Sequence, residues 1–216
     1  MKIIKELYDY REMLSNLVKK DLKVRYKGSV LGFLWTFLNP LLQLIVYTIV
    51  FSTIMKVNID KFYIYLFIGL IPWLFFATCI QAGSTSILMN KDLIKKIYFP
   101  RIILPISTVN SAFMNMFYSM IVVILTILVS GIGFSKYVLL LPLAMIMQYI
   151  LVLGMTFIFS ALNVYFRDLE YILNIIVMIW FYLTPIVYEI EMIPEKFRFW
   201  FYLNPMTGII NFYRNI

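Results

Sequence analysis

The chain has 216 residues, of which 62% are apolar and 14% are charged, and its mean hydropathy is +0.88. A soluble domain is about half apolar and about a quarter charged because its surface faces water, so this composition predicts an all-α integral membrane protein. The chain has no histidine, one cysteine (Cys79) and no Gly-Lys pair. These absences exclude histidine-dependent catalysis, histidine-ligated zinc, an intramolecular disulfide and a P-loop, and we expect no catalytic, metal or cofactor site in this chain.

The N-terminal segment 1–31 is the most charged part of the chain. Within it, apolar side chains recur in a 4-3-4-3 spacing at Ile3, Leu7, Tyr10, Leu14 and Leu17. This spacing places them on one face of a helix over residues 3–22. Because the other side of the helix carries lysines, we predict an amphipathic helix in the cytoplasmic membrane interface. The alternative is a soluble helix packed on protein, but the sequence offers no other soluble segment for it to pack on.

Five long stretches without charge follow, at 28–55, 62–90, 102–135, 137–166 and 171–188. About 20 apolar residues in a helix cross a hydrocarbon core of about 30 Å. The first four stretches exceed that length and the fifth is near the minimum. No stretch carries a central Lys, Arg or Asp, each of which would cost about 2.5–3.5 kcal/mol. We therefore predict five transmembrane helices at 32–55, 62–83, 106–131, 137–162 and 171–188.

Basic residues near the ends of these spans predict the orientation. Segment 1–31 carries eight, the loop after the second span carries four, and Arg167 makes thirteen on one side, against five on the other side, with Arg214 unassigned. The positive-inside rule then places the N-terminus in the cytoplasm. The cluster of Lys and Arg at 19–27 could be taken for a nucleic-acid site. We interpret it instead as a topology signal beside anionic headgroups, and we expect membrane lipid and no nucleic acid as a partner.

The loop after the second span contains a second amphipathic segment. Asn90 can cap a short helix that carries Leu93, Ile94 and Ile97 and that ends before Pro100. Two amphipathic helices on the cytoplasmic side of a membrane protein indicate a docking surface for a peripheral partner.

The segment 189–216 differs from the spans before it. A polar stretch, 189–198, precedes an apolar run, 199–213, that Asn204-Pro205 interrupts. The run is too short to cross a membrane, so we predict two short re-entrant helices in the outer leaflet. An interfacial aromatic belt is the alternative explanation for its aromatic residues. Five spans leave the C-terminus outside, and we expect a sixth span beyond residue 216 within one transmembrane domain.

Several motifs resemble those of one family in the same order. They are Asp21-Leu-Lys-Val-Arg25-Tyr-Lys-Gly with Gly32-Phe-Leu-Trp35 and Asn39-Pro40, Phe99-Pro100-Arg101 with Leu104-Pro105, Asn163 with Arg167-Asp168, Thr184-Pro185-Ile-Val-Tyr188, and Leu203-Asn204-Pro205-Met206. Together they resemble the permease subunits of bacterial ABC transporters that export polysaccharides such as O-antigen, teichoic acid or capsule. Such permeases normally have six spans.

The resemblance implies a homodimeric permease in the bacterial inner or plasma membrane, with ATP and Mg²⁺ bound by a separate ATP-hydrolysing subunit. It implies that the N-terminal helix, the second loop and the fourth loop couple the two subunits. The coupling residues would be Asp21, Arg25, Asn90, Leu93, Lys95, Lys96, Arg101, Arg167 and Asp168. The outer segment would form a gate containing Pro185, Pro194, Trp200, Asn204 and Pro205.

A lipid-linked glycan keeps its hydroxyl groups hydrated, so its path must be wet, with aromatic faces on which sugar rings can slide. Candidates for that path are Trp35, Tyr47, Trp73, Trp180 and Tyr182. An ion-coupled transporter would need ionisable residues inside its spans, and these have none. A membrane enzyme would need convergent carboxylates, which the predicted topology separates. The remaining alternative is an exporter of the same architecture for a drug, an antibiotic or a lipid.

Overall fold

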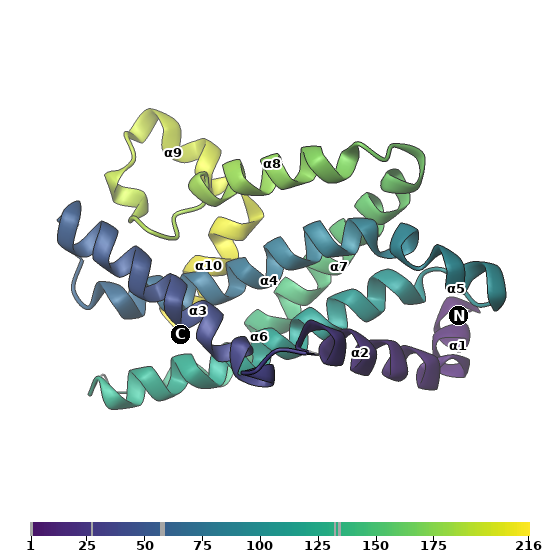
Figure 1. The fold of residues 1–216 in the computed structure, drawn as a ribbon. Coiled ribbons are helices and arrows are strands. Elements are labelled where there is room, and N and C mark those ends of the chain that lie inside the picture. Colours follow the sequence, from purple (N-terminus) through teal and green to yellow (C-terminus); the bar gives the residue numbers. More distant parts are fainter. Residues whose placement is uncertain (1, 27, 57–58, 132, 134) are drawn as a thin grey trace. The chain divides into compact units, whose positions relative to one another are not determined.

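The computed structural model describes residues 2–26, 28–56, 59–131, 133 and 135–216. Within these ranges every regular element is a helix (Figure 1). By length and composition, four helical runs can cross a membrane: Gly32–Ser52, Phe62–Lys96, Ile103–Val129 and Lys136–Tyr165. They coincide with the first four predicted spans, and the prediction of an all-helical chain with several membrane-crossing helices is confirmed.

Three of the runs begin and end within three residues of their predicted bounds, and the second begins at its predicted residue but ends at Lys96 rather than at 83. The first contains a 3-10 turn, η1 (Gly32–Leu34), then α3 (Trp35–Tyr47) and a π-helical turn, η2 (Thr48–Ile54). The others are built on α4 (Phe62–Met89), on α6 (Ile103–Val129) and on η3 (Lys136–Leu140) with α7 (Leu141–Tyr165). The second run is longer than predicted because α4 continues six residues past residue 83 and a further short helix, up to Lys96, follows it.

The fifth predicted span, 171–188, is shorter in the structure. Its helix, α8, covers Leu169–Tyr182, which is 14 residues or about 21 Å, less than the hydrocarbon core. Residues 183–188 are not helical. Pro185 explains the early end, because a proline has no N–H for the helix and disfavours the helical conformation of the residue before it.

Short helices occupy the remaining segments. The N-terminal segment forms two of them, α1 (Lys2–Asp9) and α2 (Arg11–Tyr26), rather than one. The second loop forms α5 (Lys91–Lys96). The C-terminal segment contains a 3-10 turn, η4 (Ile190–Met192), then α9 (Glu195–Tyr202) and α10 (Pro205–Asn215), which are the two short helices that the sequence predicted there.

The chain divides into two compact units. The first comprises residues 1–33, 76–114 and 149–177. Its apolar cluster is centred on Leu17, Phe99, Ile103 and Leu104, each of which is buried. A second close contact in this unit joins Gly83 on α4 to Thr156 on α7, whose hydroxyl donates to the carbonyl of Cys79 (3.5 Å).

The second unit comprises residues 34–75, 115–148 and 178–216. Its buried centre contains a polar connection among three helices. The Gln148 amide on α7 donates to the carbonyl of Pro72 on α4 (2.7 Å) and accepts from the Tyr213 hydroxyl on α10 (3.0 Å). Buried polar groups need such partners, so this connection fixes where α10 lies against α4 and α7.

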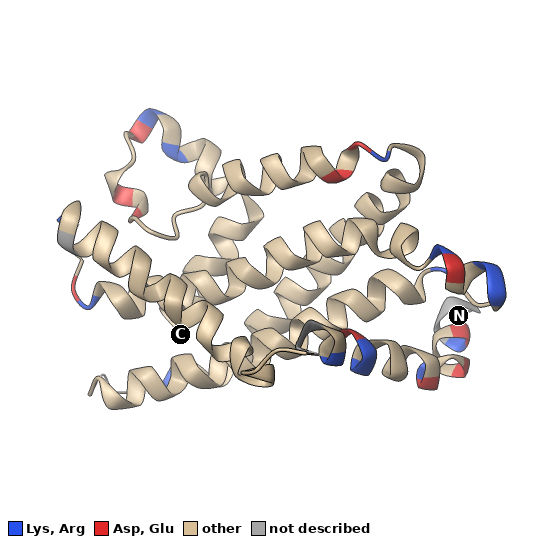
Figure 2. Cartoon of the chain, in the orientation of Figure 1, with Lys and Arg blue, Asp and Glu red and all other residues tan. Residues whose placement is uncertain are grey.

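Charged residues lie on the short helices and in the connections between helices. Figure 2 shows Lys, Arg, Asp and Glu on α1, α2 and α5, in the turn between α7 and α8, and in the segment before α9, while the long helices carry none along their middle parts. This distribution is the one that a hydrocarbon core requires.

Candidate functional site

The apolar stripe of the N-terminal helices is used for packing within the first unit. Leu17 of α2 lies in the cluster with Phe99 and Ile103, and partly buried side chains from both sides join it, namely Leu7, Tyr10, Met13, Leu14, Ile87, Leu93 and Ile94. The prediction that this stripe faces the membrane interface rested on the lack of a protein surface for it to cover. The structure provides one, made of α5 and the beginning of α6.

The helix α5 is amphipathic in the structure. Leu93 and Ile94 face the α2 cluster, while Lys91, Lys95 and Lys96 are exposed. Two lysines in the last turn of a helix are favourable beside its carbonyl end. The packing leaves the charged side of α5 directed away from the chain, which suits contact with another protein.

Two details of the second loop differ from the prediction. Asn90 stands at the N-cap position of α5, but its side chain makes no capping bond and donates instead to the carbonyl of Ser86 (2.8 Å). The helix ends at Lys96, so Ile97 lies outside it in extended conformation and is exposed. The Asn90 amide bonds to α4 instead of α5 because the last carbonyls of α4 lack donors within their own helix.

The other predicted coupling residues are spread over the same unit. Arg101 is exposed just before α6, and Asp21 is partly buried on α2. Arg25 belongs to α2, but its side chain lies outside the described residues. Arg167 and Asp168 are exposed in the turn between α7 and α8, beside an open depression of about 800 Å³. The structure therefore brings α2 and α5 together, and it does not include this turn in their cluster.

The second unit contains a hydrogen-bond centre at Asn204, between α9 and α10. The Asn204 amide oxygen accepts from the indole Nε1 of Trp180 (2.9 Å) and from the backbone N of Met206 (3.0 Å). Its Nδ2 donates to the carbonyl of Leu183 (3.1 Å) and to the Thr184 hydroxyl (2.9 Å). Asn204 is thus the N-cap of α10 and also ties that helix to the end of α8.

The predicted gate prolines stand at helix boundaries. Pro194 is the N-cap of α9, and Pro205 is the first residue of α10, where its missing N–H costs nothing. Pro185 lies in the buried non-helical segment after α8. Trp200 is exposed on α9, with its ring edge-on to Phe199 (centroids 5.8 Å apart).

Arg214, which the sequence left unassigned, connects three parts of the second unit. Its Nη1 donates to the Tyr65 hydroxyl (2.7 Å) and to the carbonyl of Pro185 (2.6 Å), and its Nη2 donates to the carbonyl of Ile186 (2.8 Å). Burial lowers the pKa of Arg214 to about 10, with Tyr65 and Glu189 opposing the decrease, so the guanidinium stays charged at neutral pH.

The segment after α8 is further held by its own tyrosine. The Tyr188 hydroxyl donates to the carbonyl of Tyr182, and the carbonyl of Tyr188 accepts from the Tyr65 hydroxyl (2.9 Å).

Three of the five aromatic residues predicted for the glycan path meet at one ring that the prediction omitted, Phe181. Tyr47 stacks on it (centroids 5.8 Å apart), and Trp73 and Tyr182 meet it edge-on (5.7 and 5.3 Å). Trp73 is only 4% exposed and supports this cluster from inside, whereas Tyr182 is 61% exposed. Trp180 is held by Asn204, and Trp35 begins α3.

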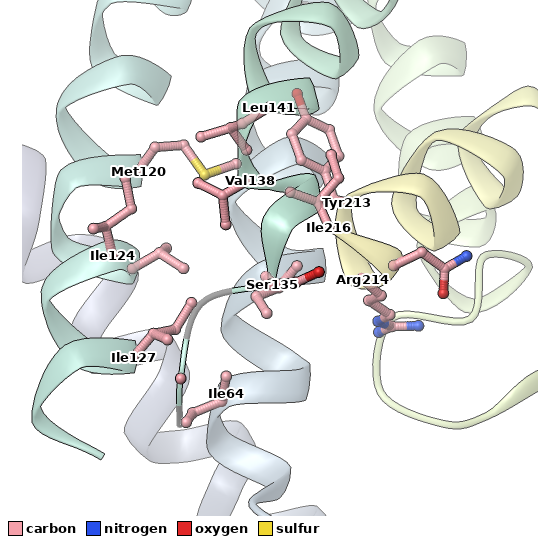
Figure 3. A pocket seen from close by; sticks show the side chains of 14 residues that line it. Ile64, Met120, Ile124, Ile127, Ser135, Val138, Leu141, Tyr213, Arg214 and Ile216 are labelled. Carbon is pink, nitrogen blue, oxygen red and sulfur yellow. The ribbon is translucent and has the colours of Figure 1, made fainter. Parts of the chain in front are cut away.

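An apolar cavity of about 270 Å³ also lies in the second unit. Figure 3 shows side chains of α6, including Met120 and Ile124, on one side and those of Val138 and Leu141 near them, with Arg214 at the margin. The other labelled lining residues are Ile64, Ile127, Ser135, Tyr213 and Ile216. The lining is chiefly aliphatic, so the cavity favours an apolar occupant over a hydrated one.

No group of three or more Cys, Asp and Glu that could hold a metal ion occurs among the residues that the structure describes. The described site residues fall into two groups, the α2–α5 helix pair of the first unit and the hydrogen-bonded α9–α10 segment of the second unit. A family model described as ABC-2 type transporter matches residues 13–216. The chain belongs to the ABC-2 type transporter family.

Curated relatives of this ABC-2 transporter chain carry more specific names. The O-antigen export system permease protein RfbA of Myxococcus xanthus is 37% identical over 218 residues, covering 100% of this chain and 84% of the relative. A protein of the same name from Klebsiella pneumoniae is 38% identical over 206 residues, covering 95% and 80%. The polysialic acid transport protein KpsM of Escherichia coli is 24% identical over 207 residues, covering 92% and 78%.

Family membership confirms the resemblance that the motifs indicated. The ABC-2 chain is a transport component, and its several apolar helices make it a multi-pass membrane protein. Sequence reasoning missed Arg214, Tyr65 and Phe181. A lone arginine in an otherwise apolar segment was the one signal that could have directed attention to the first of them.

Proposed function

We propose that this chain is the membrane-spanning permease subunit of an ATP-driven exporter that moves a lipid-linked polysaccharide out of the cytoplasm. The observation that carries the proposal is the similarity to two O-antigen export permeases, at 37% and 38% identity over at least 95% of this chain. The weaker similarity to a polysialic acid transport protein also supports a polysaccharide as the substrate. O-antigen, teichoic acid and capsule are the polymers that this proposal includes.

Energy for export comes from a separate ATP-binding subunit that also binds Mg²⁺. The exposed lysines of α5 and the packing of α5 on α2 support a docking surface on this helix pair. Movement of the ATP-binding subunit against α5 would pass through the shared apolar cluster to α2 and to the beginning of α6. Arg101, Arg167 and Asp168 are exposed on the same unit and are further candidates for contact.

Two copies of the chain form the conduit, with their N-termini in the cytoplasm. The excess of basic residues in segment 1–31 and around α5 supports this orientation. The conduit lies where the copies meet, because hydroxyl-rich sugar rings cannot lose their water inside lipid. The aromatic cluster around Phe181, with Tyr182 exposed, would offer weak and repeated stacking to a passing chain.

The helices α9 and α10 form the gate at the outer mouth as re-entrant helices. Two observations support this assignment. Neither helix reaches the roughly 20 residues needed to cross a membrane, and hydrogen bonds join the segment to the residues after α8. Non-helical backbone at membrane depth persists only when protein or water satisfies its polar groups, and Arg214 and Asn204 do this for residues 183–186. The helix α8 is too short to cross the membrane alone. The non-helical segment that follows it would complete the fifth crossing.

Deletion and complementation test the proposed function. The deletion strain should accumulate lipid-linked glycan in the cytoplasmic leaflet and lose the polymer from its surface, and the wild-type gene should restore surface polymer. The measurement is surface labelling of the polymer together with extraction of lipid-linked glycan. Unchanged surface polymer with loss of resistance to a small molecule would instead indicate an exporter of drugs, antibiotics or lipids.

A further inference from the structure

We propose that Arg214 is a positioning residue for export, because it fastens α10 to α4 and to the non-helical segment after α8. We call Arg214, Tyr65 and the carbonyl groups of Pro185 and Ile186 the Arg214 clamp. The clamp holds the two-helix segment 195–215 closed until the transport cycle moves that segment. This inference rests on the proposed function and adds to it the residue that keeps the outer segment in place.

The clamp joins three elements that are far apart in the sequence. Its two shortest bonds run from Nη1 to the carbonyl of Pro185 (2.6 Å) and to the Tyr65 hydroxyl (2.7 Å), and a third runs from Nη2 to the carbonyl of Ile186 (2.8 Å). The guanidinium carbon also lies 3.5 Å from the centroid of the Tyr65 ring. The Arg214 side chain therefore bonds α10 both to the first turn of α4 and to the non-helical segment after α8.

Arginine suits this place because its acceptors lie in different directions. A planar guanidinium offers five N–H donors in a fixed fork, whereas a lysine ammonium is a single point of charge. The Tyr65 hydroxyl accepts from Arg214 and passes its own hydrogen to the carbonyl of Tyr188 (2.9 Å). The clamp thereby supplies donors to three carbonyls of a buried segment that has no helical donors.

The surroundings of Arg214 are shaped for it. A side chain at Gly69 of α4 would bring its Cβ within 2.9 Å of Nη2, so the absence of one leaves room for the guanidinium against the helix. The partners of Arg214 among the described residues are carbonyls, a hydroxyl and a ring, and none is a carboxylate. The Glu189 carboxylate favours the charged guanidinium without bonding to it, so release of Arg214 breaks charge-assisted hydrogen bonds to neutral acceptors.

Arg198, the other arginine of the same segment, provides a contrast. Its Nε donates to the carbonyl of Ile193 (2.9 Å) and its Nη2 to the carbonyl of Glu191 (2.7 Å). Both bonds stay within a few residues of α9, so they stabilise the approach to that helix without joining it to another. Arg198→Gln is therefore the matched control for Arg214→Gln.

Thiol labelling of α10 tests the clamp in intact cells. Thr207 on α10 is fully buried, and its hydroxyl has no partner among the described residues, so Thr207→Cys is a nearly isosteric reporter. The parent carries Thr207→Cys and Cys79→Ala, which removes the other thiol, and is expressed with its ATP-binding partner. A charged methanethiosulfonate that does not cross the membrane is added outside, and the labelling rate is measured with and without depletion of cellular ATP.

Arg214→Gln should raise the labelling rate by about tenfold or more, because the bonds from a charged donor are lost, while Arg198→Gln should stay within about twofold of the parent. Arg214→Lys and Tyr65→Phe, which each keep part of the clamp, should give intermediate rates. The double variant Tyr65→Phe/Arg214→Gln should label no faster than Arg214→Gln alone, because both remove one link. The raised rate should persist after ATP depletion, whereas labelling of the parent should depend on ATP.

Equal rates in the parent and in the Arg214 variants, or an equal increase in Arg198→Gln, would overturn the inference. If Arg214→Gln fails to accumulate in the membrane, Arg214→Lys and Tyr65→Phe carry the test, and parent-like rates in both would overturn it. The proposed function is judged separately. If the wild-type gene does not restore surface polymer, the proposed function fails, whereas normal complementation with unaltered labelling refutes the clamp alone.

Discussion

Asn204 shows at the residue scale how one amide can organise a helix boundary. Its oxygen accepts from Trp180 and from Met206, and its nitrogen donates to Leu183 and Thr184. The same side chain therefore caps α10 and forms hydrogen bonds with groups at and just after the end of α8. Removal of the Asn204 side chain would leave the Trp180 indole N–H and the Leu183 carbonyl without these partners.

We expect Asn204→Ala to lower the free energy of unfolding by about 2–4 kcal/mol, because it removes a helix cap and leaves the Trp180 indole N–H unpaired. Asn204→Asp, which keeps the acceptor and loses both donors, should have a smaller effect. Thermal unfolding of the purified protein in detergent measures both. Asn211→Ala is the control on α10, and an equal loss in that variant would contradict the role assigned to Asn204.

At the scale of elements, the contact between α4 and α7 depends on a missing side chain. A Cβ at Gly83 would lie closer to the Thr156 methyl carbon than carbon atoms can approach. Gly154 on α7, by contrast, has open space around the place of its Cβ. Both glycines lie inside helices, so they differ in packing and not in backbone conformation.

Gly83→Ala should destabilise the folded protein by about 1–3 kcal/mol, because the added methyl group forces the two helices apart. Gly154→Ala should be neutral or stabilise by up to about 1 kcal/mol, since it adds helix propensity without a collision. Thr156→Ser removes the opposing methyl group and should restore stability to Gly83→Ala. Folded yield and thermal unfolding in detergent measure the series, and the same effect from both glycine variants would refute the packing account.

At the scale of the whole molecule, charge is concentrated on a few short segments. The net charge is +8, yet the long helices are uncharged along their middle parts. The exposed lysines of α5 lie on a helix that is anchored by its apolar side. Charge on such an anchored helix can act on another protein without loss of the fold.

Reversal of the α5 charges should uncouple the exporter. Lys95→Glu with Lys96→Glu lowers the net charge from +8 to +4, since each reversal removes two units. We expect the double variant to abolish the ATP hydrolysis that the permease stimulates in its partner, with membrane insertion intact. The reason is that the reversed charges on α5 would no longer complement those of the partner's surface. Lys56→Glu with Lys136→Glu makes the same net change on the opposite predicted side and should leave stimulation normal. Normal stimulation in the α5 variant would remove the coupling role.

Local features of the sequence predicted the helices and the class of protein. The four long uncharged stretches predicted the four membrane-length runs, because hydrophobicity and length are properties of a continuous segment. Asn204-Pro205 predicted the break between α9 and α10, because a cap residue followed by proline acts on its own helix. The ordered motifs indicated a transport subunit before any contact was known.

Contacts between distant residues required the tertiary structure. Tyr65 and Arg214 are 149 residues apart, and no period in the sequence relates them. The direction of the Asn90 side chain, the protein surface under the α2 stripe and the meeting of three aromatic rings at Phe181 likewise depend on which helices pack together. Composition and periodicity indicate which face of each segment is buried. Which other helix covers that face depends on the packing of segments far apart in the chain, and only the tertiary structure shows it.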